Sequence, residues 1–197
     1  MRAQAHTLEA VAASMIILAS VVFALQVTAV TPLSASTASQ HIENQQQASA
    51  AGVLDAARER GVLDNAVRYW DDTNGTLHGT SGAAYTTDSE INRTAFGRML
   101  LDTFETRSIA FNVHFAYTTD GGTLVRQRFI YRGQPTDNAV MASTLVPLYD
   151  DDPLYGINAT ATTTTVNESS TYDSLIPPDS TTGLYNVVRV EVVVWRM

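Results

Sequence analysis

Apolar residues are concentrated in one uninterrupted run near the start of the chain. Positions 10–30 contain no charged residue, and their polar members are only Ser14, Ser20, Gln26 and Thr28. A helix needs about 20 apolar residues to cross the hydrocarbon core of a bilayer. The run therefore predicts a transmembrane helix over 10–30, preceded by a short leader or cytoplasmic end at 1–9.

A cleaved secretory signal peptide is the alternative for this run. The apolar part of such a peptide is usually about 7–15 residues long and follows several positive charges. Here the apolar part is longer and the basic residue before it is Arg2 alone, although small residues suited to cleavage occur over 31–38. The length favours a retained anchor. Because no further Arg occurs before Arg58, we expect a cytoplasmic N-terminus and an extracellular remainder.

The next segment, 31–70, is rich in Ala, Ser and Gln and predicts a helical stalk. Proline lacks an N–H group and clashes with the preceding helical turn, so we expect Pro32 to bend or break the helix. Gly61 is expected to interrupt it again. A thin apolar stripe is predicted on this helix at Ile42, Val53, Leu54 and Leu63.

The remaining residues, 71–197, predict an extracellular α+β head. Residues 70–89 are rich in Gly, Thr and Asp and indicate a loop. A helix is expected over 91–104, with Asp88 or Ser89 as its N-cap. The polar stretch from Asn158 to Gly183 is interpreted as a long excursion.

Strands are predicted by alternation of apolar and polar residues. Segments 108–117 and 123–131 flank the turn sequence TDGG and predict a β-hairpin. Segment 139–149 predicts a third strand, which Pro147 places at an edge or a bulge. The last strand, 184–197, is expected to present four valines on one face: Val188, Val190, Val192 and Val194. The fold class is thus α+β, a long N-terminal helix followed by an antiparallel sheet.

Charge and composition narrow the setting. The chain of 197 residues carries 20 acidic and 12 basic residues; all twelve bases are Arg, and there is no Cys. An acidic surface without Lys is typical of proteins from concentrated salt, although a GC-rich genome also favours Arg and Ala. The acidic balance argues against nucleic acid as a partner, since phosphate binding needs a basic patch. The lack of Cys excludes disulfides and thiolate chemistry.

Four Asn-x-Ser/Thr sequons occur in the chain, which is a mild excess over chance for a Thr-rich sequence. Asn74, Asn158 and Asn167 lie in predicted loops and are candidate glycosylation sites. Asn92 falls in the first turn of a predicted helix and is the poorest acceptor. The alternative is that all four arise by chance in a Thr-rich surface.

Other candidate chemistry is weak. The acidic run 150–152 is interpreted as a solvated turn, because adjacent side chains diverge and cannot converge on one cation. His6, His41, His78 and His114 show no metal-ligand spacing, and His114 is expected to be a structural or an outward-facing residue rather than a catalyst. No nucleophile motif, phosphate loop or acid pair is present. We therefore predict no metal, no cofactor and no enzymatic activity.

The stretch AQAHTLEAVAASMIILASVVFAL resembles the N-terminus of type IV pilins and pseudopilins. In that superfamily a membrane peptidase removes a short leader, and a Glu stands at the fifth mature position. The resemblance implies cleavage between Gln4 and Ala5, which would make Glu9 the fifth residue. Gln4 departs from the pattern, because the family usually has Gly there. The pieces AQAHTLEA, VTPLSAST, QHIENQQ, FNVHF, DNAVMAS, LYDDD and LYNVVRVEVVVWRM are also similar to an uncharacterised family of haloarchaeal, pilin-like membrane proteins.

The resemblance implies a structural subunit of an archaeal type IV filament or secretion-like system, more in keeping with a minor than a major subunit. Its partners would be the membrane, other pilin-like subunits, the assembly platform and a prepilin peptidase. Glu9 would pair with the free amine of a neighbouring subunit. The alternative for Glu9 is a favourable interaction with the helix dipole, and the alternative for the protein is a non-assembling surface protein whose head binds a ligand.

Overall fold

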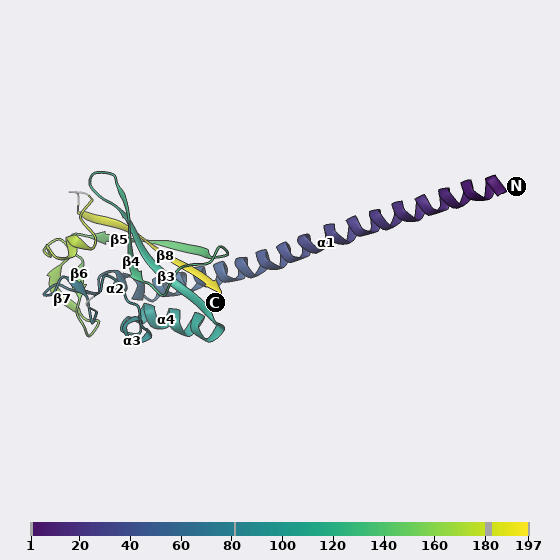
Figure 1. The fold of residues 1–197 in the computed structure, drawn as a ribbon. Helices are drawn as coiled ribbons and strands as arrows, with labels where there is room; N and C mark the ends of the chain where they lie inside the picture. Colours follow the sequence, from purple (N-terminus) through teal and green to yellow (C-terminus); the bar gives the residue numbers. More distant parts are fainter. Residues whose placement is uncertain (1, 81, 180–182, 197) are drawn as a thin grey trace. The chain divides into compact units, whose positions relative to one another are not determined.

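The chain begins with one long helix, α1 (Arg2–Glu59), in a computed structural model that describes residues 2–80, 82–179 and 183–196. The side chains of residues 2–5 and 27–39 lie outside that description. Two compact units are distinguished, residues 1–42 and residues 43–197, and we call the second the globular unit. The α+β class expected from the sequence is confirmed (Figure 1).

Of the two outcomes expected at Pro32, a bend or a break, the break is wrong, since α1 continues through that position. A proline removes its own N–H from the ladder and crowds one preceding carbonyl, at a cost of about 3 kcal/mol. That cost is confined to about one turn, so one proline does not by itself end a long helix.

The interruption expected at Gly61 is confirmed. Gly61 has φ 67° and ψ 7°, the left-handed conformation that glycine adopts without strain, and a short helix α2 (Val62–Val67) follows it. In the globular unit α1 buries Ala50, Val53, Leu54 and Ala57, which recur at helical spacing. Of the predicted stripe, Ile42 is exposed and the other three residues are buried.

The helix expected over 91–104 is divided into two. Helix α3 (Asp88–Ile91) is capped by Thr87, and helix α4 (Ala95–Phe104) is capped by Thr94, so neither predicted cap is the N-cap residue. The Thr94 hydroxyl accepts the N–H of Gly97 at 2.9 Å. Because this cap satisfies an N–H group that a continuous helix would bond to its own backbone, the chain turns between Ile91 and Thr94. A short 3₁₀ turn, η1 (Glu105–Arg107), ends α4.

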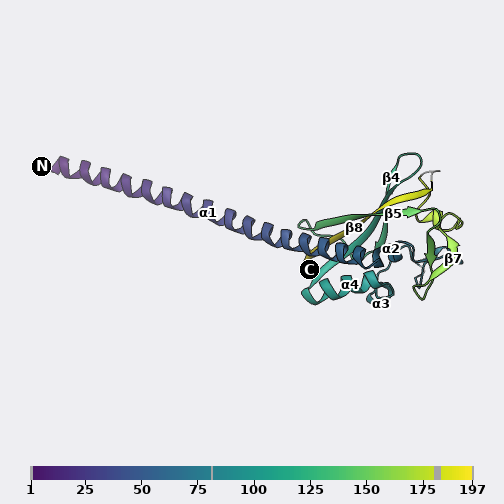
Figure 2. The same ribbon diagram turned by 180° about the vertical axis from the view of Figure 1, so that it is seen from behind.

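A four-stranded antiparallel sheet has the order β4–β3–β8–β5. Its strands are β3 (Ile109–Thr118), β4 (Leu124–Ile130), β5 (Val140–Tyr149) and β8 (Leu184–Arg196). The predicted hairpin is confirmed as β3–β4, and the four valines of β8 are fully buried. Strand β5 lies at the edge, as Pro147 predicted. Helices α3 and α4 lie on one face of this sheet (Figures 1 and 2).

The two polar stretches interpreted as a loop and an excursion contain further elements. The first holds a two-stranded ladder, β1 (Trp70–Asp71) with β2 (Thr76–Leu77). The second holds β7 (Ala161–Thr165), which pairs with β6 (Pro153–Tyr155), and the 3₁₀ turn η2 (Tyr172–Ser174). Local composition is polar in both stretches, but a few apolar residues in them are buried in the core: Trp70, Leu77, Val166, Tyr172, Leu175 and Ile176.

Helix α4 lies close against the turn that precedes it, and the contact leaves no room for a side chain at Gly97. A Cβ there would clash with the backbone carbonyl of Ile91, whereas a Cβ at Gly52 of α1 would meet nothing within 4 Å. We predict that Gly97→Ala lowers the free energy of unfolding by about 2 kcal/mol, the scale of core overpacking. The matched variant Gly52→Ala should raise it by up to about 1 kcal/mol, the difference in helix propensity. Thermal unfolding of the full chain in detergent, followed by circular dichroism, measures both, and equal stability of the two variants would contradict the packing.

Candidate functional site

The apolar segment of α1 satisfies the length and composition of a membrane span. One helical stretch among the described residues, His6–Gln26, is long and apolar enough to cross a bilayer, and its described side chains are exposed. A helix of 21 residues rises about 30 Å, the thickness of the hydrocarbon core. The segment is compatible with a single-pass anchor, and a signal sequence would meet the same criterion.

Hydroxyl groups within this segment bond to the helix itself. Ser14 Oγ donates to the Val11 carbonyl at 2.8 Å, and Ser20 Oγ donates to the Ile16 carbonyl at 2.8 Å. In a hydrocarbon environment a hydroxyl without a partner is costly, so these internal bonds suit a span.

Glu9 lies at the N-terminal end of the apolar segment with an exposed side chain. Its Oε2 is 3.8 Å from Nδ1 of His6, one turn earlier. Composition and motif alone do not point to this neighbour, although a spacing of three residues on a helix brings two side chains to the same face. Gln4 and Ala5, the predicted processing positions, belong to α1, but their side chains lie outside the described part of the chain.

The three candidate sequons differ in how free their reacting groups are. Asn74 is exposed, but its Nδ2 donates to Asp71 Oδ2 at 2.8 Å. That hydrogen bond is the main cause that holds the pKa of Asp71 below its usual value. The acceptor nitrogen of Asn74 is therefore engaged in the β1–β2 turn.

The sequon at Asn167 has an occupied hydroxyl. Ser169, its third residue, is buried, and its Oγ donates to Asp72 and accepts the N–H of Tyr172. Thr171 Oγ1 joins the same cluster, donating to Asp72 Oδ1 at 2.6 Å and accepting Trp70 Nε1–H at 3.0 Å. This network links the polar excursion to β1 and to Asp72. The Ser169 hydroxyl of the sequon is therefore engaged in hydrogen bonds that hold the fold together.

The sequon at Asn158 is open. Asn158, Ala159 and Thr160 are all exposed, in the tight turn between β6 and β7. Ala159 has φ 55°, a left-handed conformation, and no hydrogen bond of the Asn158 or Thr160 side chain is found within the described residues. The three predicted sites are thus not equivalent, and Asn158 is the most accessible.

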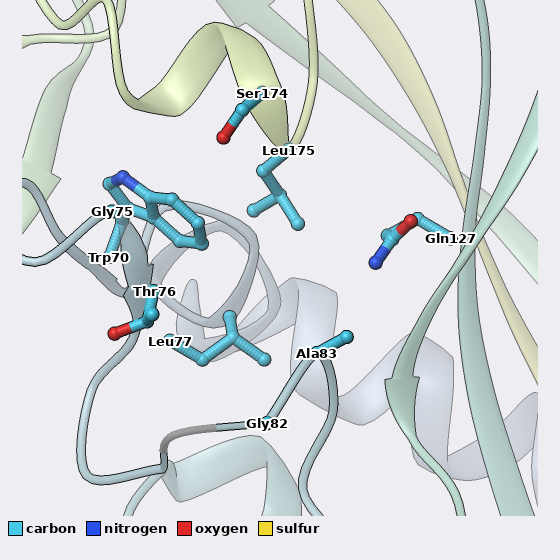
Figure 3. A pocket seen from close by; sticks show the side chains of 9 residues that line it. All are labelled: Trp70, Gly75, Thr76, Leu77, Gly82, Ala83, Gln127, Ser174 and Leu175. Carbon is cyan, nitrogen blue, oxygen red and sulfur yellow. The ribbon is translucent and has the colours of Figure 1, made fainter.

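A cavity of about 220 Å³ lies between β1–β2, Gly82 and Ala83, strand β4 and η2 (Figure 3). Its apolar walls are Trp70, Leu77 and Leu175. Gln127 of β4 points its amide toward the cavity, and no side-chain partner for that amide is found in the described part of the chain. The sequence pattern does not reveal this site, because its lining comes from four separated segments.

The acidic run forms a structural turn. Asp152 Oδ1 accepts from Arg68 Nη1 at 3.0 Å, and Asp152 Oδ2 accepts the N–H of Tyr149 at 2.8 Å. Across the described ranges, no group of three His, Asp or Glu side chains is placed to hold a metal ion. The turn at 150–152 is therefore held partly by a buried arginine rather than only solvated.

His114 is a structural residue on β3. It is buried between the strands that carry Arg126 and Glu191, which pair with each other at 2.7 Å. Burial lowers the pKa of His114 to about 4, and the nearby Arg126 contributes to the shift. The imidazole is therefore neutral near pH 7, and it does not form part of the cavity near Trp70.

Residues 2–194 match a family of unknown function (DUF7288), and the chain belongs to that family. No curated protein and no solved structure gave a match to the chain.

We predict that Asn158 is the sequon that is glycosylated in the native host. Neither its acceptor nitrogen nor the Thr160 hydroxyl has a hydrogen-bond partner among the described residues, whereas the sequons at Asn74 and Asn167 each have one of these groups engaged. Peptide mass spectrometry of the native protein should find added hexose at Asn158 and little or none at the other two. The variant Asp71→Ala frees the Asn74 amide and should increase occupancy there. Modification of Asn167 with an unmodified Asn158 would contradict this order.

Proposed function

We propose that this protein is a membrane-anchored, pilin-like structural subunit of an archaeal type IV filament or secretion-like system. In this proposal the N-terminus is cytoplasmic and the globular unit is extracellular. The subunit acts by assembly and catalyses no reaction.

One observation carries the proposal. Helix α1 contains two different kinds of segment. Its N-terminal residues form an exposed apolar segment long enough to cross a bilayer, and residues between Ala50 and Ala57 belong to the core of an α+β unit. A cleaved signal peptide is removed from the mature protein, so its helix is not expected to continue into the core of the folded domain. A helix with these two segments suits a subunit that is anchored in the membrane before assembly and packs its apolar segment against other copies afterwards.

Glu9 has a specific part in this proposal. A prepilin peptidase cuts between Gln4 and Ala5, which creates an amine about one turn from Glu9 on each mature chain. A charged side chain costs roughly 2.5–3.5 kcal/mol at the centre of a membrane helix, and this is an upper limit for Glu9, which lies at the N-terminal end of the apolar segment. Pairing of Glu9 with the amine of a neighbouring subunit offsets that cost only in the assembled filament, and so favours assembly.

We predict that Glu9→Leu leaves membrane insertion intact and reduces incorporation into filaments at least tenfold. The neighbour's amine then lacks its partner, and tenfold corresponds to about 1.4 kcal/mol, less than the full cost of one unpaired charge. Immunoblots of sheared filaments and membranes measure the two pools. Glu59→Leu, which makes the same change at the exposed end of α1, is the control and should behave as wild type.

N-terminal peptide mapping of the same samples separates processing from assembly. A mature N-terminus at Ala5 is expected in both variants. Normal incorporation of the Glu9→Leu protein would contradict the proposed role of Glu9 in assembly. An intact Met1 in the wild-type protein would favour an unprocessed membrane anchor.

The cavity beside Trp70 favours a second candidate function, a surface protein that binds a small ligand and does not assemble. None of the described residues that line it is charged. Apolar walls combined with the Gln127 amide and the hydroxyl-bearing residues Thr76 and Ser174 suit a neutral ligand with an apolar face and several hydroxyls, such as one sugar ring.

We predict that methyl glycosides, if this second function holds, change the intrinsic Trp fluorescence of the full chain in detergent. Gln127→Ala should weaken the response about fivefold, since a net hydrogen bond contributes about 1 kcal/mol. Gln134→Ala, an exposed glutamine on the β4–β5 connection, is the matched control. A panel of methyl hexosides and N-acetylhexosaminides without saturable change, with normal filament incorporation, would exclude this function.

A further inference from the structure

The two edges of the four-stranded sheet are protected very differently. Strand β4 carries Arg126 and Arg128, and near its end Tyr85 adds main-chain bonds, donating its N–H to Phe129 and accepting the N–H of Tyr131, both at 2.9 Å. Charged residues and covering segments are the usual devices that stop an edge strand from pairing with another chain. Edge strand β5, by contrast, contains no charged residue in its ten positions.

The direction of the main-chain groups of β5 follows from two observations. Pro147 has no N–H and therefore takes a position whose hydrogen-bonding groups point away from β8. The Met141 carbonyl accepts a hydrogen bond from Gln47 Nε2 of α1 at 3.2 Å, so it too points away from β8. Because these directions alternate along a strand, Met141, Ser143 and Leu145 all present N–H and C=O groups at the open edge.

The sequence of this edge reads nearly the same in both directions. Segment 140–146 is VMASTLV, centred on Ser143, with valine at both ends and a long apolar residue next to each valine. Met141 and Leu145 have 44% and 51% of their surface exposed, which is high for apolar side chains on a sheet. A strand with this symmetry is complementary to an antiparallel copy of itself.

We propose that a second copy of this chain docks on β5, and that the two β5 strands pair antiparallel about a two-fold axis at Ser143. Ser143 then lies opposite its own copy, and Met141 lies opposite Leu145 of the partner strand. Each of these opposite pairs exchanges two N–H···O=C bonds, because all three positions present both groups to the edge. The Met141 carbonyl has a second lone pair and accepts without losing Gln47.

This contact is isologous, since each strand presents the same residues to its copy. Pairing covers the apolar side chains of Met141 and Leu145, and it places Val140 opposite Val146 on the inner face. The pairing ends at Pro147, which offers no N–H, so the register is limited to the symmetric segment. It uses neither Glu9 nor the apolar segment of α1 and does not depend on the proposed filament role.

Cysteine cross-linking of the full chain in detergent tests the register, because the chain contains no Cys of its own. Ser143→Cys should form disulfide-linked dimers under mild oxidation, since paired residues lie about 5.5 Å apart between Cα atoms, within disulfide range. Leu145→Cys is the matched control on the same strand. Its copy lies four residues away, about 13 Å along the strand, and should not cross-link. A mixture of Met141→Cys and Leu145→Cys proteins should cross-link to each other.

A charge placed at the edge gives the second test. Leu145→Lys in the Ser143→Cys background should remove most of the cross-linked dimer, because a lysine at an exposed edge opposes strand pairing. Leu124→Lys on strand β4, also at an exposed leucine, should leave the dimer unchanged. Circular dichroism confirms that both variants fold. Equal cross-linking of Ser143→Cys and Leu145→Cys, or a dimer insensitive to Leu145→Lys, would overturn the proposal.

Discussion

Antiparallel pairing of the C-terminal strand β8 with both β3 and β5 is the interaction on which the globular unit depends. Residues 184–196 supply the centre of the sheet, and their valines form much of its buried face. The hairpin β3–β4 and the strand β5 have no direct ladder between them, so the sheet is complete only when the last part of the chain enters it. Helix α4 and the second half of α1 then bury their apolar residues in the same core.

A small polar network at Asp72 holds the polar surface segments together, as β8 holds the sheet together. Asp72 receives the hydroxyls of Ser169 and Thr171, and Thr171 in turn accepts the indole N–H of Trp70. These bonds tie two polar stretches that are about a hundred residues apart in the sequence. They explain why a segment with the composition of a loop is ordered, why one sequon hydroxyl is unavailable, and why Trp70 can form a wall of the cavity.

The two proposals place different demands on the chain. Filament assembly uses the apolar segment with Glu9, and pairing of β5 uses the open edge of the sheet. The two edges of the sheet differ in sequence, since β4 carries two arginines and β5 carries none. An edge without charge is an unusual feature in a chain that is otherwise strongly acidic, which is why it points to contact rather than to exposure.

Local pattern alone determined the apolar segment, the stop at Gly61, the hairpin and the burial of the β8 valines, because each depends on periodicity or on one residue's backbone preference. The division of the helix at 91–94 depended on the Thr94 cap and the close approach at Gly97, which local spacing does not reveal. The cavity and the ranking of the sequons were decided by the tertiary structure, since their partners come from distant segments. The hydrogen bond from Asn74 to Asp71 joins residues that are close in the sequence, yet it forms only once the β1–β2 turn is in place.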